Sequence, residues 1–314
     1  MLIDKTYIKP FVETTERAAF GASLYKGKND KISADQAAVD EMRKKLNSIN
    51  MKGKIVIGEG EMDEAPMLYI GEEVGKKTGK EFDIAVDPLE GTNFTAKNLP
   101  NALSVLAVAG RGNLLNAPDT YMDKIAIGPN LPENLIDLDF SIEKNINLLA
   151  QAKNVSPNKL TACLLKRKRH ESIIKVLKSM NVNINFIDDG DVSGVISVAY
   201  PKSKIDIYIG IGGAPEGVLA AAALSCLGCQ MQTRLIIKSN DEKKRAEKMG
   251  ILDFSKKYNI NDMIRGDVIF CASGVTDGDF VKGVKDLGST VKVETYTLHK
   301  SSNTNKITRN IIKK

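Results

Sequence analysis

Two stretches of this sequence end an apolar strand pattern in a turn that is rich in carboxylates. Phe82 to Asp87 alternates apolar and polar residues, which predicts a strand, and it runs into Asp87-Pro88-Leu89-Glu90-Gly91-Thr92. An earlier predicted strand, Lys54 to Gly58, runs into Gly58-Glu59-Gly60-Glu61-Met62-Asp63-Glu64. Like charges this close repel, so such turns need a hard cation, nearby Lys or Arg, or full exposure to water. The fold must therefore tolerate clustered carboxylates at the ends of strands.

Helical and strand patterns alternate along the rest of the chain. Glu13 to Leu24 predicts a helix, and Ser33 to Gln36 fits a capping box that places Asp35 in the first turn of a second helix. Strand and helix patterns then follow one another from residue 160 to 227 with short loops. This order predicts an α/β protein with a parallel or mixed sheet covered by helices.

A polar stretch from Gln151 to Asn158 is the expected boundary between two parts of the chain. We expect one subdomain over residues 1–155 and a second subdomain over residues 156–314. The last helix of the alternating region is expected to begin at Pro215 and to end before Gly228.

The charge distribution argues against a nucleic-acid-binding protein. The net charge is only +6, aromatic residues make up 5% of the chain, and there is no Trp. Ten acidic residues and three basic ones lie between Ile57 and Thr92. A nucleic-acid-binding protein usually gathers a basic stripe and stacking aromatic side chains instead.

Neither export nor a membrane span is expected. An acid stands at Asp4, and the longest nearly apolar run, Ala102 to Ala109, covers eight residues. Four cysteines are too few for a disulfide framework, so a reducing cytoplasm is expected. Cys226 and Cys229 form a CxxC spacing, but without a second such pair we expect no zinc or redox role.

Oxygen-only ligands select Mg²⁺ or Mn²⁺ over zinc, and Mg²⁺ is often shared between carboxylates and substrate phosphate. Loops that follow parallel strands meet at one edge of a sheet, so the two acidic turns are expected to lie together. A third element, Gly210 to Gly217, is a glycine-rich loop that leads into a helix carrying Glu216. It is not a dinucleotide fingerprint, because Pro215 stands where the third glycine is required.

Cations gather in Lys166-Arg167-Lys168-Arg169-His170. Beside an acidic metal cluster this run predicts a second anchor for a substrate with two phosphates, whereas taken alone it is typical of a solvated helix start. Asp189-Gly190-Asp191 is suited to binding sugar hydroxyls, and a simple Asx turn fits it equally well.

The two acidic turns, Gly58 to Glu64 and Asp87 to Thr92, and the glycine-rich loop, Gly210 to Gly217, closely resemble the class II fructose-1,6-bisphosphatases. The resemblance continues from the first turn through Ala65-Pro66-Met67-Leu68-Tyr69-Ile70-Gly71-Glu72. That family belongs to the lithium-sensitive, metal-dependent sugar phosphatases, and the resemblance runs from about Thr14 to Thr297. It implies a layered αβαβα sandwich and the hydrolysis of the 1-phosphate of fructose 1,6-bisphosphate with Mg²⁺ or Mn²⁺. It also implies that residues 1–155 form a metal-binding catalytic subdomain and residues 156–314 a sugar-phosphate-binding subdomain. It places the reaction in gluconeogenesis or carbon fixation and leaves activity on sedoheptulose 1,7-bisphosphate open.

The resemblance also implies roles for individual residues. The metal ligands would be Asp35, Glu59, Asp87, Glu90 and Glu216. Thr92 would orient the attacking water, with Asp63 as a second catalytic candidate. Substrate contacts would fall on Glu90, Gly91, Thr92, Tyr121, Arg167, Lys168, Arg169, Asp189, Gly190, Asp191 and Gly213. The chain departs from the family at Lys168, where a proline is common, so the shape of the basic loop is not carried over.

Three other functions stay open at this point. A related phosphatase would act on an inositol or nucleotide phosphate, a basic nucleic-acid-binding protein would use the net positive charge, and a cation-buffering protein would bind Mn²⁺ without releasing phosphate. We expect a sugar bisphosphate as the partner, no nucleic acid or membrane, and a homo-oligomer (dimer or tetramer).

Overall fold

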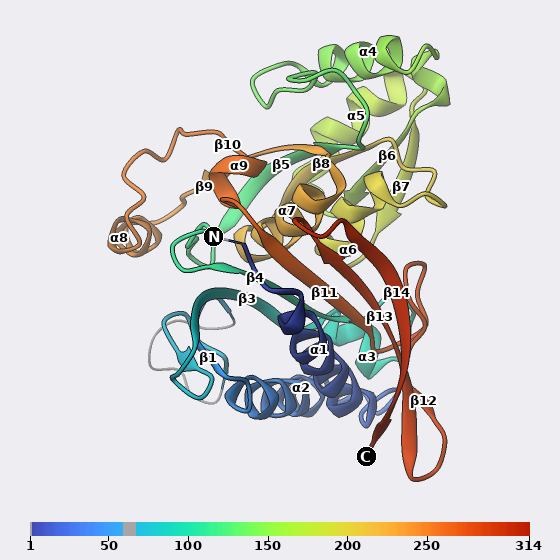
Figure 1. Cartoon of the computed structure of the whole chain (residues 1–314). Helices are drawn as coiled ribbons and strands as arrows, with labels where there is room; N and C mark the ends of the chain where they lie inside the picture. Colours follow the sequence, from blue (N-terminus) through green and yellow to red (C-terminus); the bar gives the residue numbers. More distant parts are fainter. Residues whose placement is uncertain (1, 59–66) are drawn as a thin grey trace. The chain divides into compact units, whose positions relative to one another are not determined.

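A computed structural model describes residues 2–58 and 67–314 (Figure 1). The chain divides into two compact units, unit 1 with Met1–Asn116 and Ile264–Lys314, and unit 2 with Ala117–Met263. Each unit contains a β-sheet with helices packed on it, so the expected α/β class is confirmed. No helix of the described residues combines the length and apolar character needed to cross a membrane.

Unit 1 contains a mixed sheet, eight-stranded over the described residues. Its central strands run in the order β13-β11-β4-β3-β1, with β3 and β1 parallel and the other neighbours antiparallel. The short strands β12 and β2 end the row, and β14 pairs with the outer side of β13. The elements are η1 (Lys5–Tyr7), α1 (Ile8–Ser23), α2 (Lys31–Asn47), β1 (Met51–Ile57), β2 (Glu73–Val74), β3 (Lys80–Glu90), α3 (Thr92–Ala96), β4 (Leu103–Gly110), β11 (Val268–Gly274), β12 (Lys285–Asp286), β13 (Thr290–His299) and β14 (Thr304–Lys313).

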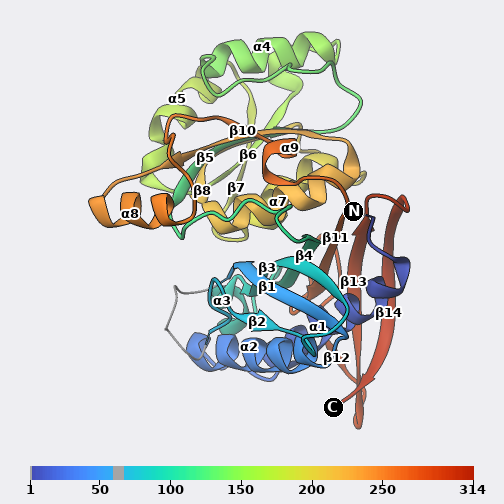
Figure 2. The same cartoon turned by 60° about the vertical axis from the view of Figure 1, so that its left-hand side comes forward.

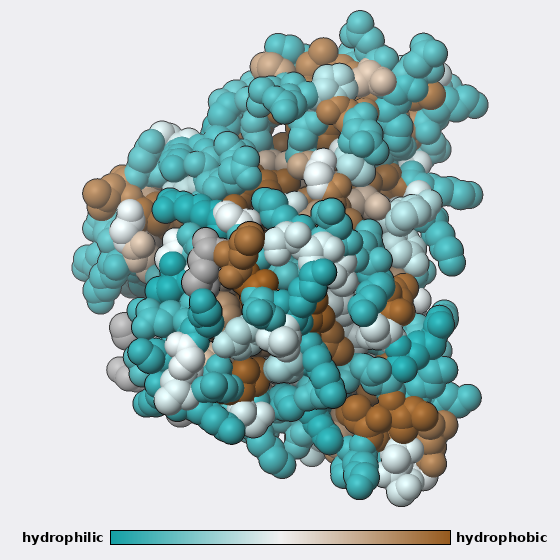
Figure 3. Space-filling model, viewed as in Figure 1, coloured by the Kyte–Doolittle hydropathy of each residue, from teal (hydrophilic) through white to brown (hydrophobic). Residues whose placement is uncertain are grey.

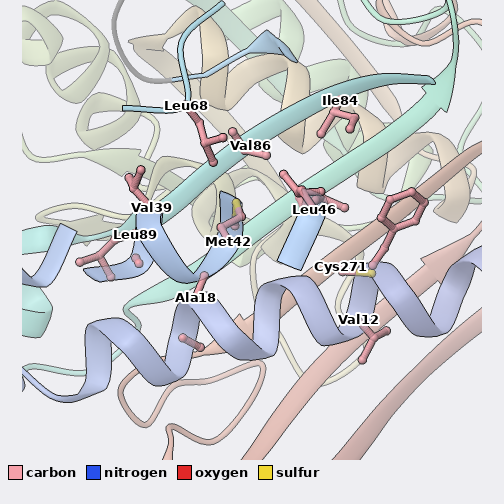
Figure 4. Close-up of a cluster of buried hydrophobic side chains, with 14 of the residues drawn as sticks. Val12, Ala18, Val39, Met42, Leu46, Leu68, Ile84, Val86, Leu89 and Cys271 are labelled. Atoms are coloured by element: carbon pink, nitrogen blue, oxygen red, sulfur yellow. The ribbon is translucent and has the colours of Figure 1, made fainter. Parts of the chain in front are cut away.

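Helices α1 and α2 lie side by side against one face of the unit 1 sheet (Figure 2). Their apolar stripes meet the alternating inward residues of the strands, and the close-up in Figure 4 shows Ala18, Met42 and Val86 gathered between helices and sheet. Complete burial of such side chains, at roughly 25 cal/mol per Å² of apolar surface, is the main stabilising contribution to this unit.

Unit 2 contains a sheet that is six-stranded over the described residues, in the order β10-β9-β5-β8-β6-β7. Strand β5 lies antiparallel between β8 and β9, and β6 runs parallel to both β7 and β8. The elements are β5 (Tyr121–Ile127), α4 (Ile142–Ala152), η2 (Pro157–Lys159), β6 (Thr161–Leu165), η3 (Lys168–His170), α5 (Glu171–Ser179), β7 (Asn183–Ile187), α6 (Asp191–Ile196), η4 (Ser197–Ala199), β8 (Ile207–Gly213), α7 (Ala214–Leu227), β9 (Gln230–Ile236), α8 (Asn240–Lys248), β10 (Tyr258–Asn259) and α9 (Ile260–Met263).

The strands of unit 2 present different residues to their two faces. Ile125 and Ile127 of β5 share one apolar core with Leu149 of α4 and Leu177 of α5. Their neighbours point to the opposite face because side chains alternate along a strand. There, Lys124 lies against α7, where a Cβ on Gly217 would lie 3.2 Å from the lysine Cε.

The expected boundary at residues 155 and 156 is wrong. It falls between α4 and β6, whose side chains Leu149 and Leu164 belong to one core. The segment Ile264–Lys314 joins unit 1 because β11 inserts beside β4, with Phe270 opposite Ala107. Pairing between strands that are distant in sequence sets the division, and a polar stretch in the chain does not reveal it.

The surface of the molecule matches a chain with mild net charge. Figure 3 shows a face covered largely by hydrophilic residues, with apolar patches between them. Cys226 and Cys229 are free thiols, and burial raises the pKa of the Cys229 thiol to about 12. A thiol with so high a pKa remains protonated at neutral pH.

Candidate active site

The acidic turns of unit 1 follow neighbouring parallel strands. Strands β1 and β3 are parallel and in contact, with Ile55 opposite Ile84 and Ile57 opposite Ala85. Their carboxyl ends therefore lie at the same edge of the sheet, as the sequence predicted. Glu59 and Asp63 of the first turn lie outside the described residues.

The second turn is bent by an irregularity in the pairing of β3 with β4. Asp87 is opposite Val105 and Glu90 is opposite Leu103, so the register shifts between them. Such a bulge redirects side chains at the end of a strand. The carboxylate of Asp87 accepts a hydrogen bond from the backbone N–H of Leu89 at 3.1 Å, which closes the turn.

Gly91 connects this bend to helix α3. Its φ of 81° and ψ of 50° are left-handed, a conformation that costs glycine little and most other residues more. Thr92 is the first residue of the helix, and Glu90 is buried with 4% of its surface exposed. The structure thus brings Asp87, Glu90, Gly91 and Thr92 together within one turn.

Asp35 lies on helix α2, which packs against both α3 and β3. The predicted capping box at Ser33 is wrong, because Asp30 is the N-cap and its side chain accepts a hydrogen bond from the Ser33 N–H at 3.0 Å. The helix begins at Lys31, so Asp35 sits beyond the first turn, half-buried.

Asp191 is the centre of a buried polar network in unit 2. Its Oδ2 pairs with the Lys124 ammonium, whose side chain has no exposed surface, and its Oδ1 accepts a hydrogen bond from the Tyr208 hydroxyl. A Cβ on Gly212 would overlap the Asp191 carboxylate, so glycine leaves the room that this side chain occupies. We name Lys124, Asp191 and Tyr208 the lysine network.

Glu216 lies in the first turn of α7 behind Gly213, where Pro215 opens the helix as predicted. A Cβ on Gly213 would overlap the Glu216 carboxylate, so this glycine forms a cradle for it. Burial raises the pKa of the Glu216 carboxyl, and the charge of Lys124 opposes that shift. A half-buried carboxylate beside a helix N-terminus is a suitable ligand for a hard cation.

The cations of the basic loop are held by backbone carbonyls. Arg169 donates from Nε and Nη2 to the Ile211 carbonyl at 3.1 and 2.9 Å, and Arg167 donates from Nη2 to the Asp188 carbonyl at 2.8 Å. Lys168 is exposed. Carbonyls orient a guanidinium without neutralising it, so both arginines keep their full charge for an anionic ligand.

The His170 ring holds the end of the basic loop in place through contacts with the backbone. Its Nδ1 lies 2.7 Å from the Leu165 carbonyl, and its Nε2 accepts a hydrogen bond from the Ile211 N–H at 2.8 Å. This pattern assigns the neutral tautomer with the proton on Nδ1. Burial lowers the pKa of the ring, which favours the same neutral state.

Tyr121, at the start of β5, contacts the basic loop. The Arg169 Cζ lies 4.7 Å from its ring centroid, and the Lys238 Nζ lies 4.4 Å from the same centroid. The Tyr121 residue is 39% exposed. Lys238 was not expected from the sequence, because only strand pairing brings the end of β9 to the start of β5.

Asp189 and Gly190 form the turn before α6. The Asp189 Oδ1 accepts the Gly190 N–H at 3.1 Å, and Gly190 takes a left-handed φ of 81°. Burial raises the pKa of the Asp189 carboxyl. This contact reaches the next residue, whereas an Asx turn uses the N–H two residues on, so it is not the expected Asx turn.

The chemistry of the expected metal ligands suits a hard cation. Asp35, Asp87, Glu90 and Glu216 offer oxygen ligands only, and the absence of a side chain at Gly213 leaves room for the Glu216 carboxylate. Over residues 2–58 and 67–314, no three His, Cys, Asp or Glu side chains form a group that could hold a metal ion. Glu59 and Asp63, the other expected acidic participants, fall outside that range.

Comparisons with known proteins agree over almost the whole chain. The profile of bacterial fructose-1,6-bisphosphatases, glpX-encoded, matches residues 5–312. The fructose-1,6-bisphosphatase class 2 of Haemophilus influenzae is 41% identical over 308 residues, covering 94% of this chain and 92% of the relative. Fructose-1,6-bisphosphatase 1 class 2 of Escherichia coli K12 is 42% identical over 308 residues, which cover 94% of this chain and 91% of the relative. A D-fructose 1,6-bisphosphatase class 2/sedoheptulose 1,7-bisphosphatase of Synechococcus sp. (strain JA-3-3Ab) is 40% identical over 318 residues, which cover 93% of this chain and 91% of the relative.

Proposed function

The chain belongs to the bacterial, glpX-encoded fructose-1,6-bisphosphatase family of phosphoric monoester hydrolases, and we propose that it hydrolyses the 1-phosphate of fructose 1,6-bisphosphate. The products are fructose 6-phosphate and phosphate. The observation that carries the proposal is the family match over residues 5–312, which includes every motif that bears carboxylates or clustered cations. Sedoheptulose 1,7-bisphosphate is a second candidate substrate, favoured by the name of the Synechococcus relative.

We propose that Mg²⁺ or Mn²⁺ is the metal of this metal-dependent phosphatase. Asp35, Glu59, Asp87, Glu90 and Glu216 would hold it. When bound, the cation lowers the pKa of a water ligand and offsets the negative charge of the phosphoryl oxygens. Carboxylate ligands without nitrogen or sulfur favour these hard ions over zinc.

The roles of the remaining residues follow from their chemistry. The Gly91 and Thr92 N–H groups donate to phosphoryl oxygens, where a buried turn strengthens each hydrogen bond. The Thr92 hydroxyl would orient the attacking water, and Asp63 is a second candidate for polarising that water. Arg167, Lys168 and Arg169 bind the phosphate that is not hydrolysed, and Tyr121, Asp189, Gly190 and Gly213 contact the sugar. For Asp191 we propose that it positions this pocket, because the lysine network uses both of its oxygens.

Phosphate release from a panel of substrates tests the activity. The panel contains fructose 1,6-bisphosphate, sedoheptulose 1,7-bisphosphate, an inositol monophosphate and a nucleoside monophosphate, each with and without Mg²⁺ or Mn²⁺. The proposal expects turnover of the six-carbon bisphosphate that requires the cation. Faster hydrolysis of the inositol or nucleotide ester would replace it with a related phosphatase activity.

Replacing Glu90 with Gln tests the ligand set. We expect kcat to fall by roughly 10²- to 10⁴-fold, because an amide oxygen lacks the negative charge that the cation requires. The matched control is Glu73→Gln, which changes an exposed glutamate on β2 and should leave kcat unchanged. Near-normal turnover in the Glu90 variant would remove this residue from the ligands.

We also propose a cytoplasmic homo-oligomer, a dimer or a tetramer. The absence of a disulfide framework among the four cysteines fits a reducing compartment. Light scattering coupled to size-exclusion chromatography measures the mass directly, and a mass near 34.2 kDa would show a monomer instead.

A further inference from the structure

Two cations share the ring of Tyr121. The Arg169 Cζ lies 4.7 Å and the Lys238 Nζ 4.4 Å from the ring centroid, both within the range of a cation–π interaction. The three residues come from separate segments: the start of β5, the basic loop, and the connection from β9 to α8. The fold therefore brings two positive side chains to one exposed aromatic ring.

The backbone at Lys238 is fixed by the start of α8. Ser239 is the N-cap of this helix, and Ser239 and Glu242 form a capping box. The Glu242 carboxylate also accepts the Lys238 N–H. On the other side, Ile236 is paired with Tyr121 across the sheet, only two residues before Lys238. The lysine is thus anchored beside the ring by both the strand and the helix.

No carboxylate forms an ion pair with Arg169 or Lys238 among the residues that the structure describes. The Arg169 guanidinium donates to the Ile211 carbonyl, which leaves Nη1 for another acceptor. Asp123 lies two residues from Tyr121 on the same face of β5, and it is paired across the sheet with Arg234, whose positive charge acts on it. Two like charges on one ring, without a counter-ion from the protein, form a site for an external anion.

We propose that Lys238 is a further substrate-binding residue, which together with Arg169 holds the phosphate of the sugar bisphosphate that is not hydrolysed. This inference rests on the proposed function and adds a residue to it. The lysine supplies a compact charge and Arg169 a directed N–H donor, the two kinds of contact that phosphate accepts. Such a residue favours the bisphosphate over fructose 1-phosphate as a substrate, because fructose 1-phosphate has no second phosphate to place there.

The test is steady-state phosphate release by Lys238→Met with two substrates, fructose 1,6-bisphosphate and fructose 1-phosphate. We expect KM for the bisphosphate to rise about tenfold with kcat within about twofold, because a remote contact is made equally in the ground and transition states. For fructose 1-phosphate, kcat/KM should stay unchanged. Lys238→Arg should restore most of the affinity for the bisphosphate.

Lys243→Met is the matched control. Lys243 is also exposed and also lies over an aromatic ring, with its Nζ 5.9 Å from the Phe254 centroid, but it is on the body of α8. Its replacement should change neither substrate's KM. An equal change of kcat/KM for both substrates in Lys238→Met, or no change for either, would overturn the inference.

Binding of fructose 6-phosphate, measured by calorimetry, separates this inference from the proposed activity. It needs no hydrolysis, and Lys238→Met should weaken it about tenfold relative to the wild type and to Lys243→Met. If Lys238→Met binds fructose 6-phosphate more weakly and the wild type does not hydrolyse fructose 1,6-bisphosphate, the anion site is supported and the proposed activity is rejected. Undiminished binding in the variant would reject the role of Lys238 even in an active enzyme.

Discussion

The two units each bury a carboxylate beneath a helix, and they stabilise it in opposite ways. In unit 1, Glu16 of α1 is 1% exposed, and its Oε1 accepts hydrogen bonds from Thr295 Oγ1 at 3.3 Å and Asn310 Nδ2 at 2.7 Å. In unit 2, Asp191 has the Lys124 ammonium and the Tyr208 hydroxyl. One acid is surrounded by neutral donors and the other is paired with a cation.

The difference appears in the partners of each acid. Burial raises the pKa of the Glu16 carboxyl from its usual 4.5 to about 6, because neutral donors only partly replace water. Asp191 instead forms a buried ion pair with Lys124. A buried carboxylate is thus a proton-binding group in one unit and one half of an ion pair in the other, where the basic loop lies.

Replacing Lys124 with Met removes the cation that distinguishes the buried acid of unit 2 from that of unit 1, and we expect it to have the largest effect on stability. We expect the free energy of unfolding to fall by about 3–5 kcal/mol, because Asp191 would be buried without its counter-ion. Urea unfolding followed by circular dichroism measures the loss. The double variant Lys124→Met/Asp191→Asn should recover part of it, and an equal or larger loss in the double variant would argue against the ion pair as the cause.

Replacing Tyr208 with Phe removes only the second donor to Asp191. The expected loss is about 1.5–3 kcal/mol, the usual range for a hydrogen bond to a charged acceptor. The control is Tyr7→Phe, whose hydroxyl donates to the Asn50 carbonyl at 3.2 Å near the surface. Similar losses in the two variants would show that the charge on Asp191 adds little.

Replacing Glu16 with Gln tests how the buried carboxyl of unit 1, which has only neutral donors, contributes to stability. The folded protein binds this proton more tightly than the unfolded chain, so the stabilising contribution of protonated Glu16 is present below about pH 4.5 and is lost as the pH rises through about 6. Gln does not titrate, so the variant should exceed the wild type by roughly 2 kcal/mol at pH 7.5 and match it near pH 4. Unfolding curves at both pH values measure this, and a pH-independent difference would contradict it.

The sequence predicts the elements whose pattern is local. The strand at Phe82 to Asp87 and the helix from Pro215 to Leu227 are present, and Gly228 ends that helix with a φ of 69°. Strand β5 was not expected, because Asp123 and Lys124 interrupt its apolar pattern. Strand β14 was not expected either, because it is an edge strand with mostly exposed residues, such as Lys306.

The candidate site divides in the same way. Asp87 and Glu90 share one turn, so their proximity can be read from six consecutive residues. Lys124, Tyr208 and Lys238 reach their partners only through sheet pairing or helix packing, and a single sequence contains no signal for such contacts. One clue existed for Lys124, since it is a cation with the apolar Met122 shortly before it and the apolar Ile125 and Ala126 directly after it.

Unit 2 interrupts unit 1 along the chain, and this has a consequence for synthesis. Strand β11 fills the place between β4 and β13, so the larger sheet lacks its middle until residues 268–299 have left the ribosome. Residues 117–263 are complete earlier, and since domains fold as units during translation, we expect the inserted part to fold first. Limited proteolysis of stalled nascent chains would record that order. The half-built sheet would meanwhile expose the edge of β4, which makes the early strands the aggregation-prone part of a nascent chain.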